Sequence, residues 1–504
     1  MLTRRHHRRF AIASVALAGA VLATACTAGS VRPQAEGSDP AVAREEPAPP
    51  AQQRVSLATD GRRSSGGVVA EGGADAVYNY GPTVMVDGGR TRMWWCSQYG
   101  SAAPPGDDIL YATAASADGP FRGPGGGMPV AVFSGNRGAF DAVHTCDPSV
   151  IRVDGTYYMY YTGAAGDHAL GNAIGLATST DGRHWTRPVD GPVVRPAHDT
   201  RRDNTYGAGQ PAAVYLDGWF YLMFTDTTGR AAGWNGAGQF LLRAKDPAFS
   251  SGVEALGPQG FAAVPDTATA RTNSLVDAFS ADLMWVDALD AFAIAHQTDG
   301  GTTITFWNRD FSATPYEPVF IPDRWQEGPG LVRQPDGHAP VSETDPCGRV
   351  PLDVIHATVI GRADAPTALR HFGLDVHGVD GCGDPRRALA VLDGFAMPSP
   401  VRTMDLVVNG AVLRIDRRSV AEHLAVRVLD ERLPALDGLP VRTRLRPNAQ
   451  AVQAPGLGTG FLLDGTLYPV TSADAVDRND SVVQPVSRDE WETYPVGPTL
   501  GRRF

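Results

Sequence analysis

The sequence predicts an all-β protein: a five-bladed β-propeller followed by a small C-terminal β-rich module. The main observation is a repeated motif, in which an apolar strand, an Asp-Gly turn and an aromatic-rich strand follow one another. It recurs at intervals of roughly 45 to 70 residues, a spacing that suits a four-stranded propeller blade. A second observation is that the motif stops near residue 400, where hairpins of a different type begin.

Five copies of the motif place the propeller at residues 74–400. The clearest copy is Cys146-Asp-Pro-Ser-Val-Ile-Arg-Val-Asp-Gly, which runs into Thr156-Tyr-Tyr-Met-Tyr-Tyr. An Asp-Gly pair between apolar and aromatic runs is a strong signal of a β-hairpin. A row of immunoglobulin-like sandwiches is the alternative, but it explains neither the uniform hairpin nor the absence of linkers. The other copies begin at Tyr80, Gly209, Ser280 and Glu327.

The C-terminal module, residues 401–504, contains two hairpin patterns and a predicted short helix from Ser472. We consider two roles for it, attachment to a wall or glycan and simple packing against the propeller. Both stay open at this stage.

The N-terminus predicts export. Four arginines precede an apolar run, Phe10 to Ala25, which is the order of a signal peptide over residues 1–25. The run is shorter than the roughly 20 residues of a membrane-spanning helix. Cys26 follows small residues in a pattern that resembles the lipobox of bacterial lipoproteins, so we expect a lipid on Cys26. The alternative is cleavage near Ala25 and a soluble secreted protein.

Residues 26–73 are rich in Pro, Ala, Gly, Ser and Gln without hydrophobic periodicity, which predicts a disordered spacer after the lipidated cysteine. We therefore expect the protein at the outer face of the cytoplasmic membrane, held only by the lipid anchor, or secreted. The net charge of −11 argues against a nucleic-acid partner. The chain is expected to be a monomer.

Five cysteines fit an exported protein. Four remain when Cys26 is set aside, an even number for an oxidising compartment. Three pairings are possible, and we favour Cys96–Cys146 with Cys347–Cys382, because each closes a loop within one or two structural units. No C-x-x-C spacing suggests a zinc site.

Three segments resemble a known group of enzymes. The run Asp147-Pro-Ser-Val-Ile-Arg-Val-Asp-Gly-Thr-Tyr-Tyr-Met-Tyr-Tyr resembles a blade motif of the five-bladed propeller glycoside hydrolases, which include family 43 and its relatives. Ser179-Thr-Asp-Gly-Arg-His-Trp resembles their turn after the third strand. Glu327-Gly-Pro resembles the segment that carries the general acid in family 43.

The inner strands of a propeller converge on one axis, so the residues at their starts would face one funnel. Three of the five residues at these places are acids, and glycosidic cleavage needs one protonated and one ionised carboxyl group. Crowded carboxylates also raise one another's proton affinity. The five residues are Gly81, Asp147, Gln210, Asp282 and Glu327.

The resemblance implies catalytic roles for three of these residues. Glu327 would be the general acid, and Asp147 the base or the carboxylate that stabilises positive charge in the sugar ring. Asp282 would be a third carboxylate that tunes the pKa of the acid. Family 43 places its acids on three successive blades, whereas these lie on the second, fourth and fifth motifs, with Gln210 where an acid is expected.

Other side chains are predicted to contact substrate, with Trp325 as the sugar-stacking candidate. We expect no required cofactor, although the resemblance implies that His356 could help to hold a structural calcium ion in the axial channel. The remaining substrate-binding candidates are Asp141, His144, Gln210, Asn79, Tyr80 and His296.

The sequence thus favours a cell-surface glycoside hydrolase acting on a polysaccharide or oligosaccharide, such as an arabinan- or xylan-like polymer or an envelope glycan. The alternative is a non-catalytic glycan-binding surface lipoprotein. A glycoside phosphorylase or transglycosylase stays open as a third reading.

Overall fold

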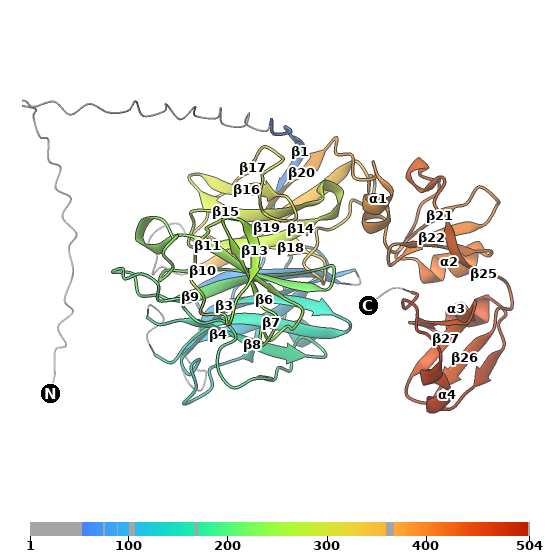
Figure 1. The fold of residues 1–504 in the computed structure, drawn as a ribbon, viewed down its shortest axis with the longest axis horizontal. Helices are drawn as coiled ribbons and strands as arrows, with labels where there is room; N and C mark the ends of the chain where they lie inside the picture. Colours follow the sequence, from blue (N-terminus) through green and yellow to red (C-terminus); the bar gives the residue numbers. More distant parts are fainter. Residues whose placement is uncertain are drawn as a thin grey trace, which may run out of the picture. The chain divides into compact units, whose positions relative to one another are not determined.

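The computed structural model describes residues 53–73, 76–87, 89–99, 106–166, 170–358 and 367–501. The predicted signal peptide and Cys26 lie outside these residues. The described chain consists mainly of β-sheets with a few short helices (Figure 1). Within it, no helix combines the length and the apolar character that a membrane crossing requires.

Strands β1 to β20 form three sheets of eleven, five and four strands, which divide into five antiparallel groups with one copy of the motif in each. Parallel strand pairs join the first, second and fifth groups into the eleven-stranded sheet. The first group is β2 (Asn79–Asp87), β3 (Arg90–Tyr99), β4 (Gly106–Ala114) and β5 (Val130–Phe133); the second is β6 (His144–Val153), β7 (Thr156–Ala164) and β8 (Ala173–Ser179). The third is β9 (Ala208–Leu216), β10 (Trp219–Asp226), β11 (Gln239–Ala244), β12 (Glu254–Gly257) and β13 (Gly260–Ala263). The fourth is β14 (Ala281–Val286), β15 (Ala291–Thr298), β16 (Gly301–Trp307) and β17 (Val319–Pro322); the fifth is β18 (Glu327–Arg333), β19 (Arg349–Thr358), β20 (Ala368–His377) and β1 (Ala58–Ser64).

The Asp-Gly turns form as the motif predicts. Asp154 and Gly155 both have positive φ angles, 47° and 83°, and Asp217 and Gly218 repeat this pair at 52° and 81°. Such a turn matches the twist of the two strands that it connects. The first three motifs therefore fold locally into hairpins. In the fourth the turn is a 3-10 helix, Asp287–Leu289, and in the fifth residues 334–348 separate the two strands. The first strand of each motif lies next to the first strands of other groups.

The first strands contact one another in a cycle: β2 with β6, β6 with β9, β9 with β14, β14 with β18, and β18 with β2. Equivalent side chains connect several of these pairs. The backbone N–H of Val150 donates to Thr83 Oγ1 at 3.3 Å, and that of Ala213 donates to Ser149 Oγ at 2.9 Å. The N–H of Leu331 donates in the same way to Asp282 Oδ2 at 2.8 Å.

Arg333, at the end of β18, is buried among these strands and connects four of the five groups. Its guanidinium donates to the carbonyl oxygens of Leu283 (2.7 Å) and Ala213 (3.1 Å). It also donates to Thr83 Oγ1 at 2.9 Å and forms an ion pair with Asp282 Oδ1 at 3.2 Å. A buried guanidinium needs such partners, because each unpaired donor would cost free energy.

The predicted spacer is too long at its C-terminal end. Residues 58–64 form β1, which pairs with β20 and completes the fifth group. Arg63 fixes this strand by donating to both Asp353 and Asp375. Hydrophobic periodicity could not reveal β1, because almost all of its side chains are exposed and its pairing uses the backbone.

The C-terminal module begins earlier than predicted, because Phe395–Pro398 (β21) already pairs with its second strand. It contains two sheets with one shared order: a strand, a hairpin, a short helix, and a strand that returns parallel to the first. One comprises β21, β22 (Met404–Val408), β23 (Ala411–Ile415), α2 (Arg418–Leu424), β24 (Arg427–Val428) and β25 (Val441–Leu445); the other comprises β26 (Ala451–Ala454), β27 (Gly458–Leu463), β28 (Thr466–Val470), α3 (Asp474–Arg478) and β29 (Val483–Pro485), before α4 (Arg488–Thr493). The helix predicted from Ser472 is therefore present as α3.

Both favoured disulfides are confirmed. Cys96–Cys146 joins β3 of the first group to β6 of the second. Cys347–Cys382 joins the segment between β18 and β19 to the segment before α1 (Pro385–Val391). The first of these places a covalent link one residue before Asp147.

We predict that Arg333→Met destabilises the protein by about 3–5 kcal/mol, because it leaves the charge of Asp282 buried without its partner. Urea unfolding of the purified protein measures this loss. The double variant Arg333→Met/Asp282→Asn should recover part of it, since neither charge is then left alone. If the double variant lost as much free energy of unfolding as the two single variants added together, the pairing of Arg333 with Asp282 would be contradicted.

Candidate functional site

The starts of the five first strands surround one small cavity of about 40 Å³. All five residues predicted to face a funnel line it: Gly81, Asp147, Gln210, Asp282 and Glu327. Ordinary ligand pockets measure roughly 300 Å³ or more. The cavity therefore has room for a few reacting atoms of a ligand, and the rest of a ligand would lie outside it.

Three of the strands reach the cavity through the same backbone irregularity. Gly81, Asp147 and Gln210 have φ angles of 54°, 45° and 52°, and each precedes a proline. The register with the neighbouring strand shifts at each of these places. A bulge of this kind turns a side chain in a new direction. Asp147 and Gln210 accept a strained left-handed conformation, which is common where a side chain is aimed for function.

Asp147 lines the cavity and is 8% exposed. Burial raises the pKa of Asp147, and the neighbouring His144 and hydrogen bonds to Thr162 and Tyr206 act in the opposite direction. Gly81 faces this carboxyl group closely, since a Cβ at Gly81 would lie 2.8 Å from Asp147 Oδ1. A side chain at position 81 would therefore be strained and would crowd the Asp147 carboxyl group.

Glu327 is the first residue of β18 and is partly exposed to the cavity. Its Oε2 accepts a hydrogen bond from the Tyr78 hydroxyl at 2.9 Å. Burial, and then the charges of Asp147 and Asp107, raise the pKa of Glu327 to about 8, although the bond from Tyr78 lowers it. Glu327 is thus mainly protonated at neutral pH, unlike an ordinary glutamate.

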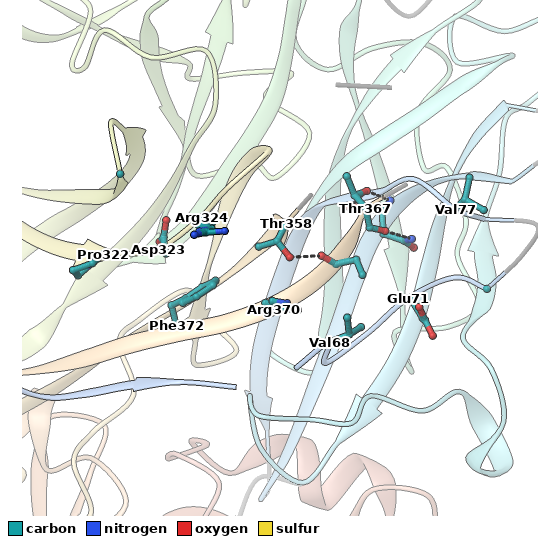
Figure 2. A pocket seen from close by; sticks show the side chains of 14 residues that line it. Val68, Glu71, Val77, Pro322, Asp323, Arg324, Thr358, Thr367, Arg370 and Phe372 are labelled. Atoms are coloured by element: carbon teal, nitrogen blue, oxygen red, sulfur yellow. Dashed lines mark hydrogen bonds between the residues drawn. The ribbon is translucent and has the colours of Figure 1, made fainter. Parts of the chain in front are cut away.

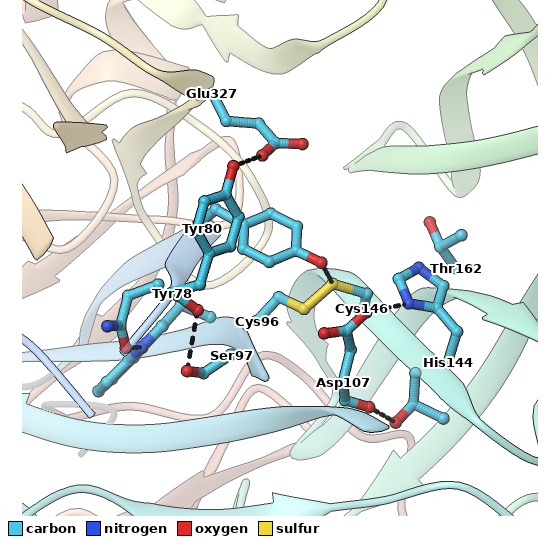
Figure 3. The surroundings of a disulfide bond; sticks show 12 residues. Tyr78, Tyr80, Cys96, Ser97, Asp107, His144, Cys146, Thr162 and Glu327 are labelled. Carbon is cyan, nitrogen blue, oxygen red and sulfur yellow. Dashed lines mark hydrogen bonds and ion pairs between the residues drawn. A yellow bond between two sulfur atoms is a disulfide. The ribbon is translucent and has the colours of Figure 1, made fainter. Parts of the chain in front are cut away.

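Behind Asp147, Asp107 and His144 form a buried pair (Figure 3). His144 Nδ1 lies 2.6 Å from Asp107 Oδ2. The disulfide Cys96–Cys146 lies beside this pair, and the Tyr80 hydroxyl donates to Cys146 Sγ at 2.8 Å. The covalent link and these hydrogen bonds hold the strand that carries Asp147.

Asp282 differs from the role predicted for it. Asp282 is equivalent in position to Thr83 and Ser149, which accept the same kind of backbone hydrogen bond in their groups. Ser149 lies two residues after Asp147, so Asp282 is not equivalent to Asp147. The carboxylate of Asp282 forms an ion pair with Arg333. The residue equivalent to Asp147 in this group is Ser280, whose Oγ donates to Gln210 Oε1 at 2.9 Å. The charges that raise the pKa of Glu327 come from Asp147 and Asp107, and Asp282 is not among the causes.

Several other residues predicted to contact substrate make hydrogen bonds within the protein instead. Asp141 is fully buried and accepts hydrogen bonds from Tyr161 and Arg187. The side chain of Asn79 donates to the carbonyl oxygens of Ala76 and Thr367, and accepts from Trp95. Neither residue lines the small cavity.

The aromatic and histidine candidates on the later groups also lie off the small cavity. The indole N–H of Trp325 donates to the Thr298 carbonyl oxygen at 2.9 Å. His296 is partly buried, and burial lowers its pKa. Tyr80 is nearly fully buried and contacts the disulfide, as described above.

The surroundings of His356 do not fit a calcium ion. Its ring is wholly buried, with Nε2 2.6 Å from Thr302 Oγ1 and 3.3 Å from Asp323 Oδ2. Calcium prefers six to eight oxygen ligands. Among the described residues, the two clusters with metal-ligand spacing both contain Cys146, whose sulfur is already in a disulfide.

Three site residues were missed by sequence reasoning. Tyr78 and Asp107 act on Glu327. Tyr206 is partly buried close to Asp147, and burial, followed by the charge of Asp147, raises the pKa of Tyr206. Tyr78 lies three residues before Gly81 and Tyr206 four before Gln210, so tyrosines just ahead of the motifs were a usable signal. Asp107 lies in a third strand, where the motif offers no such signal.

A larger cavity of about 830 Å³ borders the strand pair that carries Glu327 (Figure 2). Asp323 and Arg324 line it just before Glu327 in the chain. Thr358 lines it directly after Ala357, which pairs with Glu327. The cavity also includes Asn79, the neighbour of Tyr78, and it shares no lining residue with the small cavity. Its volume is in the range of small-molecule sites.

No family model and no curated protein sequence matches this chain. Among solved structures, it is similar to a family 117 glycoside hydrolase from the marine bacterium Zobellia galactanivorans (TM-score 0.42, 13% identity, covering 63% of this chain and 91% of that one). It is also similar to an α-L-arabinofuranosidase from Podospora anserina, solved with cellotriose (TM-score 0.39, 11% identity, 62% and 96%). A putative glycoside hydrolase from Parabacteroides distasonis is a third (TM-score 0.39, 12% identity, 62% and 97%). Likeness at this level assigns neither a family nor an activity.

We predict that Gly81→Ala is more destabilising than Gly155→Ala. Both glycines have positive φ, so each alanine costs about 1–2 kcal/mol in backbone strain. At Gly155 the new Cβ meets nothing within 4 Å, whereas at Gly81 it meets Asp147. Urea unfolding of the two variants compares the costs, and equal losses would contradict the close approach of Gly81 to Asp147.

Proposed function

We propose that this protein is a glycoside hydrolase, in which the five strand groups form a five-bladed β-propeller around the small cavity. The observation that carries the proposal is the pair of carboxyl groups on that cavity. Glu327 is held protonated near neutral pH, and Asp147, whose charge acts on Glu327, lines the same cavity. Glycosidic cleavage needs a proton donor and an ionised carboxylate on opposite sides of the bond.

In this mechanism Glu327 donates its proton to the glycosidic oxygen as the bond between that oxygen and the anomeric carbon breaks. In one route Asp147 takes a proton from the water that adds to the anomeric carbon, and exchange with bulk water then removes this proton from Asp147 and returns one to Glu327. In the other route Asp147 first attacks the anomeric carbon, and the Glu327 carboxylate then takes a proton from the water that displaces Asp147, which restores both groups. Tyr78 orients Glu327 through its hydrogen bond, and the amide of Gln210 offers a contact for a sugar hydroxyl.

The substrate that we propose is a polysaccharide or oligosaccharide, of arabinan, xylan or envelope type as the motif resemblance suggests. The small cavity would take the reacting atoms, and the cavity of about 830 Å³ beside β18 and β19 offers room for further sugar units. We propose a location outside the cytoplasm, with the lipid on Cys26 as anchor. The two disulfides support an oxidising compartment.

A non-catalytic glycan-binding protein is the second candidate. The observation in its favour is that Asp282, the expected third acid, is neutralised by Arg333 and so leaves two carboxyl groups for chemistry. Hydrolysis and binding differ in whether sugar is released.

The first test is Glu327→Gln, which keeps the shape of the side chain and removes the acid. We expect it to lower sugar release from a panel of arabinan, xylan and arabinogalactan by about 10²- to 10⁴-fold. Glu317→Gln is the matched control, because Glu317 is exposed and lies outside the cavity. Equal release by wild type and Glu327→Gln would refute the role of Glu327, and no release by wild type on any polymer would favour the binding protein.

The second test is the pH profile. A general acid with a pKa of about 8 predicts that kcat/KM is maintained below that pH and falls as Glu327 loses its proton above it. Tyr78 stabilises the ionised form, so Tyr78→Phe should raise the pKa of Glu327 and move the alkaline fall upward by about one unit. A downward shift, or a fall unchanged in position, would contradict the contact between Tyr78 and Glu327.

A further inference from the structure

Trp234 lies in the connection between β10 and β11, on the same face of the third group as the small cavity. The end of β10 pairs with the start of β9, with Thr225 opposite Gly209 and Asp226 opposite Ala208. Gln210, which lines the cavity, follows directly. Residues 227–238 therefore leave the sheet at the end where the cavity lies.

The side chain of Trp234 is 78% exposed, although tryptophan is a large apolar residue that proteins usually bury at least in part. It is the most exposed of the large hydrophobic side chains in the described residues. An exposed indole on the face of a site is a feature that needs an explanation, because its apolar surface is unfavourable in water.

The loop that presents Trp234 is held by many hydrogen bonds. Arg202 donates to the carbonyl oxygens of Gly229 and Ala232, both at 2.9 Å, and more weakly to those of Arg230 and Gly233. Asn204 Nδ2 donates to the carbonyl oxygen of Asn235 at 3.0 Å. The exposure of Trp234 thus belongs to a specified loop conformation.

The backbone directly after Trp234 also has an unusual conformation. Asn235 has a φ of 50°, an uncommon conformation for a residue with a side chain. Gly236 has a φ of 93° and packs against Thr227, where a Cβ would lie 2.7 Å from Thr227 Cβ. Such strain is maintained where the direction of a neighbouring group matters.

The chemistry around the indole fits a sugar better than a protein surface. The side chains against residues 229–235 include the polar groups of Arg202, Asn204 and Asp277, the last of which lies close to Gly233. A protein interface would need a contiguous apolar patch at its centre. A sugar ring presents a small apolar C–H face bordered by hydroxyl groups, which one aromatic ring with nearby amide and charged groups can bind.

We propose that Trp234 is the aromatic platform of a glycan-binding subsite at the rim of the site, where a sugar ring stacks on the indole. The inference deepens the proposed function, on which the identity of the ligand as a glycan rests. It assigns a recognition role to a loop that the catalytic pair does not use.

The test measures binding apart from hydrolysis, in the Glu327→Gln background. Affinity electrophoresis in gels that contain arabinan, xylan or arabinogalactan gives the retention of each variant. We expect Trp234→Ala to weaken retention by about three- to tenfold and Trp234→Phe to keep most of it, since an aromatic ring remains. Phe320→Ala is the matched control, because Phe320 is 42% exposed on β17 and lies outside this loop.

A second readout reports on the indole itself. Xylo- and arabino-oligosaccharides should shift the fluorescence of the protein and protect it from acrylamide quenching, and Trp234→Ala should abolish the protection. The other eight of the nine tryptophans stay in place in that variant. Unchanged retention together with unchanged protection in Trp234→Ala would overturn the subsite, as would the absence of retention of the parent on all three polymers.

The outcomes separate this inference from the proposed function. Trp234-dependent retention without sugar release by wild type would support the subsite and refute hydrolysis. Sugar release that depends on Glu327, with retention independent of Trp234, would support hydrolysis and refute the subsite.

Discussion

The buried contact of Arg333 with Asp282 and the surrounding strands is the interaction on which the rest of the molecule depends. One guanidinium binds carbonyl or hydroxyl oxygens of the first, third and fourth groups from its own place in the fifth. Hairpins whose turns are determined by nearby residues are thereby connected through one side chain. Because the charge can be buried only when all these partners are present, the contact selects the arrangement in which the strand starts meet.

The chemistry of the site follows from that arrangement. Once the strand starts meet, Glu327 is removed from water and lies within the field of Asp147 and Asp107, and both effects raise its pKa. A carboxyl group on a separate hairpin would ionise as an ordinary glutamate. The protonated state of Glu327 is thus a property of the assembled groups, and the disulfide Cys96–Cys146 holds two of those groups together beside Asp147.

On the face of the site, residues with strained backbone conformations are also firmly held by their surroundings. Asp147 and Gln210 at the cavity and Asn235 beside Trp234 all have positive φ, and each is held by hydrogen bonds of its surroundings or by close packing. These residues lie where strands begin or loops turn, whereas the hydrophobic core is formed by the regular parts of the strands. The framework is therefore rigid enough to keep a few residues in costly conformations that aim side chains outward.

The sequence alone determined the features that are encoded in contiguous residues. These are the repeated hairpins with their Asp-Gly turns, and the acids Asp147 and Glu327 next to Gly or Pro at the strand starts. The tertiary structure decided the features that depend on how the groups meet. It showed that Asp282 pairs with Arg333, that Tyr78 and Asp107 act on Glu327, and that the exposed residues of β1 complete the fifth group. The physical reason is that turn preferences act over a few residues, whereas burial, charge coupling and edge pairing arise between strands that are distant in the chain.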